Sequence, residues 1–279
     1  MIADEAAPRW LAIRARPGLG RSEAVAAALF DLGSSGVQED GGLLITQLPP
    51  GTDREAVRRA LLDADHTADI HFAEAEPVDW SEKWRDRVRA HDLGAITVTP
   101  PWLAEGMDPA RTVVVDPGMA FGTGEHATTR GVIRLLPRVL RDGDVVADLG
   151  AGSAVLSIAA VKLGAARVAA IESDGDAIEN AEENVRRNGV AGRVTVIEGD
   201  ATTLLPLVAP VRVVLANIIS SVLLELLPAI RNALTPDGAA ILSGILVEER
   251  DRMLLALGEW RVVAEDHEEG WWSVAVAKA

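Results

Sequence analysis

The second half of the chain alternates between buried-strand runs and segments with helical spacing. Five runs are almost wholly apolar and end in a polar or glycine-rich group, as strands covered on both faces do. These runs lie at 144–150, 166–174, 193–200, 211–218 and 238–245. Between them, helical patterns lie at 154–164, 175–189 and 220–234. Because alternation of this kind forces parallel pairing, we expect a doubly wound α/β sheet.

The last stretch of the chain breaks this alternation. Residues 260–279 carry two strand signals joined by a short polar turn instead of a helix. We therefore expect an antiparallel strand to close the sheet at the carboxyl end of the chain. No internal repeat or low-complexity tract interrupts the pattern.

The first 76 residues follow a different order of elements. Strand patterns lie at 10–15, 41–48 and 69–76, the short arm of a hairpin at 36–40, and helical patterns at 21–33 and 53–64. Asp53 is a suitable N-cap for the second helix, and Gly33 is a suitable end for the first. This order of strand, helix, two strands, helix and strand predicts a small α+β ferredoxin-like domain.

These patterns divide the chain into three parts. We expect the ferredoxin-like domain at 1–76, a linker with a helix at 77–104, and the larger α/β domain at 105–279. In the linker, Trp80 and Trp84 share one face of the predicted helix. That spacing is typical of a connector helix whose tryptophans pack on a neighbouring domain.

Composition narrows the classes of protein and partner. The net charge of −15 opposes the phosphate backbone, so we expect no direct nucleic-acid binding, and a basic protein is the favoured partner. The chain has no cysteine, which excludes disulfides and thiolate nucleophiles and fits a cytoplasmic location. The apolar window 211–230 is interrupted by polar residues, so we expect no membrane span. The five histidines are scattered, and we predict no metal site.

Polar groups at three strand ends predict a nucleoside-binding crevice. In open sheets of this type, ligands bind beyond the carboxyl ends of the strands. Gly150 and Gly152 permit a tight turn and a close approach of ligand to backbone. Glu172 is placed to accept hydrogen bonds from ribose hydroxyls. Asp200 suits an adenine amino group, or alternatively the N-cap of a short helix.

Several nucleotide and acyl-transfer sites are disfavoured. The dinucleotide-binding motif has a third glycine at the position where this chain has Val155, which disfavours a nicotinamide or flavin oxidoreductase. The chain has no phosphate-binding loop with a G-K-[ST] ending. Ser153 is not centred in the spaced glycines of a hydrolase elbow. What remains is S-adenosylmethionine, which offers an adenosine but no phosphate.

The segment 119–130, MAFGTGEHATTR, is too irregular for a strand and too rich in glycine for a helix interior, so we expect a loop that leads into a helix. This segment and several others resemble the bacterial ribosomal protein L-eleven methyltransferase family, whose members are class I S-adenosylmethionine-dependent methyltransferases with a Rossmann-like fold. The resemblance runs through nearly the whole chain. It is carried by segments 79–84, 116–130, 148–168, 216–219, 242–246 and 269–277.

The resemblance implies roles for individual residues. The loop that contains Phe121, Gly122 and Thr123 would fold over the methionine end of the cofactor. Family cofactor contacts carry onto Thr129, Gly150, Glu172 and Asn217. Four positions depart from the family pattern, of which Glu125 and Ala127 flank His126. Glu172 stands where aspartate is usual, and Ala154 replaces the third glycine of the turn.

The expected reaction is methyl transfer to an amino group of ribosomal protein L-eleven, on a lysine side chain or at the N-terminus. Asn217 lies where many amine methyltransferases carry an Asn-Pro-Pro-aromatic motif, although the prolines and the aromatic residue are absent here. His126 can guide or deprotonate the amine, but a single histidine in a loop is more often only a hydrogen-bonding residue. The alternatives are a related methyltransferase for another protein or a small molecule, and a catalytically silent binding module.

Overall fold

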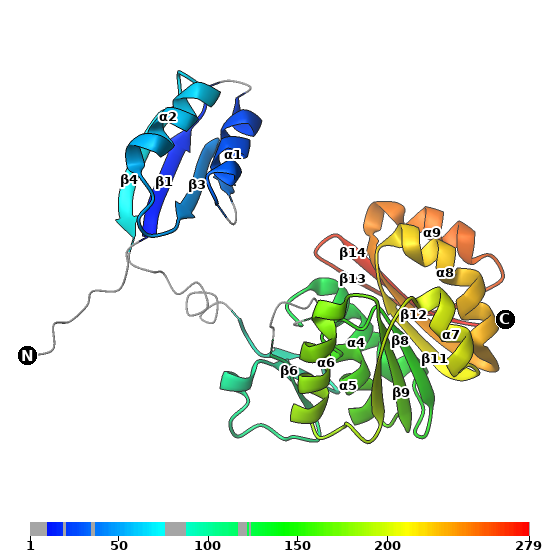
Figure 1. Ribbon diagram of the computed structural model, residues 1–279. Coiled ribbons are helices and arrows are strands. Elements are labelled where there is room, and N and C mark those ends of the chain that lie inside the picture. The colour runs from blue at the N-terminus through cyan, green and yellow to red at the C-terminus, as the bar shows by residue number, and fades with distance from the viewer. Residues whose placement is uncertain are drawn as a thin grey trace, which may run out of the picture. The chain divides into compact units, whose positions relative to one another are not determined.

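The structure is a computed structural model that describes residues 10–18, 21–34, 37–75, 88–116, 122 and 124–278. It divides into two compact units, Met1–Arg87 and Val88–Ala279 (Figure 1). The predicted linker helix with Trp80 and Trp84 lies outside the described residues.

The first unit is a four-stranded sheet with two helices. Its elements are β1 (Trp10–Arg16), α1 (Ser22–Asp31), β2 (Gln38–Asp40), β3 (Leu43–Leu48), α2 (Arg54–Ala64) and β4 (Asp69–Ala75). The strands are antiparallel in the order β2-β3-β1-β4. Alternate residues of β1, Leu11, Ile13 and Ala15, are buried in one core with α1 and α2. This is the arrangement that the sequence predicts for a ferredoxin-like domain.

Local signals explain where its helices begin and end. The side chain of Asp53 accepts a hydrogen bond from the amide of Glu55 at 2.9 Å, which caps α2. Gly33 follows α1 with a φ of +93°, a conformation that glycine adopts without steric cost.

The second unit opens with a small sheet. Its strands are β5 (His91–Asp92), β6 (Thr97–Thr99) and β7 (Thr112–Val114), with a short 3-10 helix, η1 (Pro101–Leu103), between the last two. Ile96, Val98 and Val113 are buried in the core of this unit. Residues 88–104, which we expected in a linker, are therefore part of the larger unit, because their alternating apolar side chains have a core to enter.

A seven-stranded sheet forms the centre of the second unit. Its strands are β8 (Val145–Leu149), β9 (Arg167–Glu172), β10 (Val194–Glu198), β11 (Val211–Asn217), β12 (Leu234–Leu246), β13 (Arg261–Glu268) and β14 (Trp271–Ala277). Their order is β10-β9-β8-β11-β12-β14-β13. The first five are parallel, and β14 runs antiparallel to both of its neighbours. The predicted doubly wound sheet with an antiparallel closing strand is confirmed.

Helices cover both faces of this sheet (Figure 1). They are α4 (Ala127–Val139), α5 (Val155–Lys162), α6 (Gly175–Arg187), α7 (Ala201–Val208), α8 (Ser220–Ala233) and α9 (Arg250–Leu257), with the 3-10 turn η2 (Val247–Glu249) before α9. One core takes side chains from α4, α5 and α6, and a second core takes them from α7, α8 and α9. The two cores lie on opposite faces because adjacent strand residues point in opposite directions.

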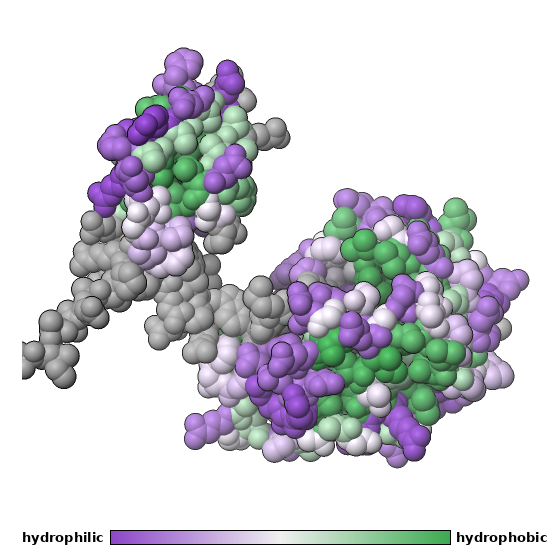
Figure 2. Space-filling model, in the orientation of Figure 1, coloured by the Kyte–Doolittle hydropathy of each residue, from purple (hydrophilic) through white to green (hydrophobic). Residues whose placement is uncertain are grey.

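Some apolar side chains stay at the surface of the second unit. Figure 2 shows apolar surface on the side that carries α7 and α8. Leu207 and Leu255 are 75% and 85% exposed. None of the helices in the described parts of the chain has the length and apolar character that crossing a bilayer requires.

Candidate functional site

The carboxyl ends of β8, β9 and β11 lie at the same edge of the sheet. From β8, the chain adds β9 and β10 on one side of the sheet and then β11 and β12 on the other side. After β8 the chain turns sharply, with φ of +66° at Gly150 and +51° at Gly152. The amides of Gly150 and Ala151 both donate to the carbonyl of Ile171, at 2.9 and 3.0 Å. A Cβ on Gly150 would lie 3.4 Å from Ile218, an ordinary contact, so glycine is required here by its positive φ.

The carboxylate of Glu172 braces this turn. Its Oε2 accepts a hydrogen bond from the amide of Gly152 at 2.8 Å. Its Oε1 accepts from the amides of Ser173 and Asp174, at 2.8 and 2.9 Å. The side chain is buried, and these three donors stabilise its charge. Glu172 therefore joins the ends of β8 and β9, and Oε2 keeps acceptor capacity for a further donor.

Helix α5 begins one residue after the start of the predicted helical segment 154–164. Ala154 is the N-cap with a φ of +63°, and the helix begins at Val155. Ser153 precedes the helix, and its hydroxyl donates to the carbonyl of Gly122 at 2.6 Å. This bond ties the loop before α4 to the glycine turn.

Asp148 lies beneath the turn and is fully buried. Burial raises the pKa of its carboxyl to about 6, and the nearby charge of Glu172 raises it further. The hydrogen bond from Ser157 acts in the opposite direction and lowers the pKa. The Ser157 hydroxyl donates to Oδ2 at 2.7 Å. Asp148 is part of the packing under the crevice, since no atom of it reaches solvent.

Asp200 caps a helix at the end of β10. Its Oδ1 accepts hydrogen bonds from the amides of Thr202 and Thr203, at 2.8 and 3.3 Å, and from the Thr202 hydroxyl. The bond from the Thr202 hydroxyl and those from the two amides lower the pKa of the Asp200 carboxyl. The N-cap alternative from the sequence is thus realised, and the exposed carboxylate stands one strand away from Glu172.

Asn217 and Thr129 meet on the other side of the crevice. The Asn217 Nδ2 lies 3.4 Å from the Thr129 hydroxyl, which is in the first turn of α4. Gly244 in β12 allows this arrangement, because a Cβ there would lie 2.3 Å from the carbonyl oxygen of Ile218. The backbone of Ile218, which follows Asn217, is therefore in direct contact with the backbone of β12.

The loop before α4 approaches the small sheet. Gly124 has a φ of +87°, and a Cβ there would lie 2.6 Å from Val98. Gly122 has a φ of +101° and is held by Ser153. Phe121 and Thr123, both predicted to contact a cofactor, lie outside the described residues.

His126 is the N-cap of α4. Its Nδ1 lies 2.7 Å from the Thr128 hydroxyl and 3.4 Å from the Thr128 amide. Burial, with Arg130 nearby, lowers the pKa of His126, and the charge of Glu269 opposes this shift. Its ring packs edge-on against Trp271 with centroids 4.9 Å apart. The lowered pKa favours the neutral imidazole, and the contacts with Thr128 and Trp271 hold the ring.

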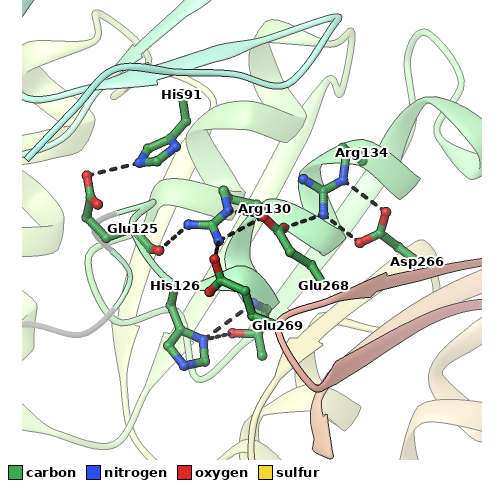
Figure 3. A network of polar contacts seen from close by, with 9 residues as sticks. His91, Glu125, His126, Arg130, Arg134, Asp266, Glu268 and Glu269 are labelled. Atoms are coloured by element: carbon green, nitrogen blue, oxygen red, sulfur yellow. Dashed lines mark hydrogen bonds and ion pairs between the residues drawn. The ribbon is translucent and has the colours of Figure 1, made fainter. Parts of the chain in front are cut away.

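A network of ion pairs surrounds His126 (Figure 3). The buried Arg130 contacts Glu268 at 2.9 Å and Glu269 at 3.3 Å, and it also donates to the carbonyl of Glu125. Arg134 on the next turn of α4 contacts Glu268 at 2.6 Å and is also paired with Asp266. The network joins the loop, α4 and the β13–β14 hairpin. We did not predict it from the sequence, where Arg130 and Glu268 lie 138 residues apart and Arg134 and Asp266 lie 132 apart.

Comparison with known proteins identifies the family. A family model described as ribosomal protein L11 methyltransferase matches residues 43–279. The chain belongs to the ribosomal protein L11 methyltransferase family. The resemblance stated from the sequence is confirmed, and so is the expectation of a methyltransferase enzyme.

Individual members of the family agree with this assignment. The chain is 36% identical to the Gloeobacter violaceus ribosomal protein L11 methyltransferase over 242 residues, which cover 85% of this chain and 74% of that protein. It is 32% identical to the Symbiobacterium thermophilum member, with 97% and 99% of the two chains covered. The crystal structure of a ribosomal protein L11 methylase from Lactobacillus delbrueckii subsp. bulgaricus matches with a TM-score of 0.61 at 29% identity, over 68% of this chain and 100% of that one.

In this member of the family, the described residues predicted from the sequence fall into two groups at the strand ends. Gly152 and Glu172 are joined by a hydrogen bond, Gly150 lies in the same turn, and Asp200 follows the neighbouring strand β10. Thr129 and Asn217 form the second group. Trp271 and Arg130 were missed. The only signals for them in the sequence are the tryptophan pair after Gly270 and the i, i+4 spacing of the arginines on α4.

Proposed function

We propose that this methyltransferase transfers methyl groups from S-adenosylmethionine to amino groups of ribosomal protein L11. The proposal rests above all on one observation: the glycine turn that Glu172 braces and the Thr129–Asn217 pair lie at the carboxyl ends of the neighbouring strands β8 and β11. The names of the related proteins support the same substrate.

The residues of the crevice fit the proposed cofactor. Gly150 and Gly152, both left-handed, leave room for a ligand against the backbone, and Glu172 and Asp200 offer carboxylate oxygens for ribose and adenine donors. We propose that Thr129 and Gly122, with Phe121 and Thr123, hold the methionine end. When bound, S-adenosylmethionine supplies an electrophilic methyl group on a sulfonium.

Asn217 is proposed to orient the amine. Because its Nδ2 is directed at the Thr129 hydroxyl, its Oδ1 is the atom of the amide that can accept a hydrogen bond. An uncharged amine has N–H groups to donate and a lone pair to direct at the methyl group. Positioning of this kind accounts for most of the rate when the leaving group is already good.

His126 is proposed to receive the proton from the substrate ammonium. A lysine side chain has a pKa near 10.4 in water, so it arrives charged and has no free lone pair. The lowered pKa favours the neutral form of His126, and Nδ1, which accepts the Thr128 amide at 3.4 Å, is the ring nitrogen whose lone pair would take the proton. The ring contact with Trp271 keeps the imidazole in place for this step.

The first unit is proposed to recognise the protein substrate. The reaction is proposed to take place in the cytoplasm, where ribosomal proteins are made. The net charge of −15 favours a basic partner over a nucleic acid. The two units would then divide recognition and chemistry between them.

Labelling identifies the substrate directly. The full chain is incubated with methyl-labelled S-adenosylmethionine and the separated proteins of the large ribosomal subunit. We expect label in ribosomal protein L11 and none in the other proteins. Label in another protein instead, or binding of S-adenosylmethionine without transfer to any of them, would contradict the proposed substrate.

A further inference from the structure

A second polar pocket lies at the opposite end of the sheet from the crevice. It has a volume of about 180 Å³. Four arginines and one carboxylate line it, and we call it the arginine pocket. These residues are Arg138, Arg141, Arg212, Arg261 and Asp237. Arg212 and Asn217 are both in β11, five residues apart, so about 16 Å separates the pocket from the crevice.

The arginines come from three parts of the unit. Arg138 is in the last turn of α4, and Arg141 follows that helix closely. Arg212 is the second residue of β11, and Arg261 is the first residue of β13. The chain as a whole carries a net charge of −15, whereas the residues around this cavity carry a net positive charge from four arginines.

Arg212 has more donors than partners. Its Nη2 lies 3.4 Å from the carbonyl oxygen of Val139, and its Nε lies 3.3 Å from Asp237 Oδ2 without the geometry of a hydrogen bond. Its Nε and Nη1 are buried and have no hydrogen-bond acceptor among the described residues. A buried donor on a charged group without an acceptor is costly, and these two atoms have no accessible surface, so Arg212 contributes positive charge beside the pocket.

The single carboxylate cannot neutralise the pocket. Asp237 pairs with Arg141 at 2.5 Å and with Arg212 at 3.3 Å, and the Arg141 hydrogen bond is the main cause of its lowered pKa. Arg138 and Arg261 form no ion pair with any residue that the structure describes. The pocket therefore retains positive charge that an anion would balance.

We propose that the arginine pocket binds a small tetrahedral oxyanion, such as inorganic phosphate. Planar guanidinium groups present paired N–H donors that match phosphate oxygens. The volume suits a single oxyanion with its water. The net charge of the chain would repel a polyanion such as RNA, so a small free anion is the favoured occupant.

Calorimetric titration of the full chain tests this proposal. Sodium phosphate is titrated at an ionic strength held constant with sodium chloride, and a short RNA oligonucleotide is titrated separately. We expect saturable binding of phosphate and no binding of the oligonucleotide at this pocket. Absence of saturable phosphate binding, or oligonucleotide binding that depends on these arginines, would overturn the proposal.

Matched substitutions locate the binding. Arg261 is exposed, and the substitution Arg261→Gln removes one positive charge from the pocket. We expect the affinity for phosphate to fall about tenfold. Arg167→Gln is the control, because Arg167 is also exposed and begins β9 at the same end of the sheet, outside the pocket. Arg212→Gln should abolish binding in protein whose circular dichroism is unchanged. Equal affinity in Arg261→Gln and Arg167→Gln would place the anion elsewhere and refute the proposal.

Discussion

Glu172 accepts a hydrogen bond from the amide of Gly152 at 2.8 Å, and so the end of β9 holds the turn that follows β8. The same carboxylate accepts two amides of its own turn. A carboxylate in this position is usually considered only for its contact with ribose. Here it also holds the turn next to the proposed ribose contact, so we expect cofactor affinity and turn stability to change together.

Glu172→Ala should reduce both properties together. The substitution leaves the Gly152 amide without its acceptor and removes the proposed ribose contact. We expect the affinity for S-adenosylmethionine to fall at least about tenfold and Tm to fall by a few degrees. Calorimetry and thermal unfolding measure the two effects, with Glu182→Ala on the exposed face of α6 as control. Unchanged affinity would show that the ribose lies elsewhere.

Gly244→Ala should disturb the site through the backbone. A Cβ at this position would lie 2.3 Å from the Ile218 carbonyl oxygen, and the φ of +84° is itself unfavourable for alanine. We expect a loss of stability of about 3 kcal/mol or more and loss of turnover as Asn217 shifts. Gly189→Ala is the matched control, with a φ of +68° and open space around it. It should cost only about 1–2 kcal/mol. Equal costs in urea unfolding would mean that the Ile218 contact is unimportant.

Methyl transfer should decline in mild acid because of His126. Burial, with Arg130, holds the pKa of this imidazole below its usual 6.5, and only the neutral form accepts a proton. We therefore expect kcat/KM to be lost as the pH falls through a midpoint below 6.5. His126→Asn keeps a residue suited to cap α4. It should lose this inflection and about a hundredfold in rate.

Glu269 provides a separate check on the same group. Its charge raises the pKa of His126, so Glu269→Gln should move the midpoint of the pH profile to lower pH. A profile with the same inflection in the His126→Asn enzyme would exclude His126 as the proton acceptor.

Arg130→Met should loosen the contact between the loop, α4 and the β13–β14 hairpin. The guanidinium is buried, and its removal leaves Glu268 with Arg134 alone. Since Glu268 remains partly exposed, we expect a loss of about 2 kcal/mol, less than for a fully buried pair. Arg231→Met breaks a pair of similar length, 3.0 Å to Glu259, at the surface. It should cost under about 0.5 kcal/mol. Chemical unfolding of both variants decides whether burial is the cause.

The central strands could be predicted because both of their faces are buried. Residues 146–149 of β8 are all buried, so the run is apolar apart from Asp148 and contrasts with the helices on either side. The short strand β6 gave no such signal, and although β7 lies in the strand-like run 112–118, its partner could not be predicted. Their pairing joins Thr97 to Thr112 across a long connection, and three residues carry too little periodicity to detect.

The candidate site divides in the same way. The strand-end positions of Gly150, Glu172 and Asp200 could be predicted because parallel strands bring their ends to one edge, whereas Asn217 was carried over from the family resemblance. The hydrogen bond between Glu172 and Gly152 could not, since it depends on how the turn folds back. The pairing of Arg130 with Glu268 joins residues 138 positions apart, and charge alone does not indicate which partner an arginine takes.

The most direct test of the proposed reaction is mass spectrometry of purified ribosomal protein L11 after incubation with the enzyme and S-adenosylmethionine. We predict added methyl groups on its amino groups with the unmodified enzyme. With Asn217→Ala, methylation should be much slower although the cofactor still binds. Ribosomal protein L11 of unchanged mass, in the presence of an enzyme that binds S-adenosylmethionine, would contradict the account.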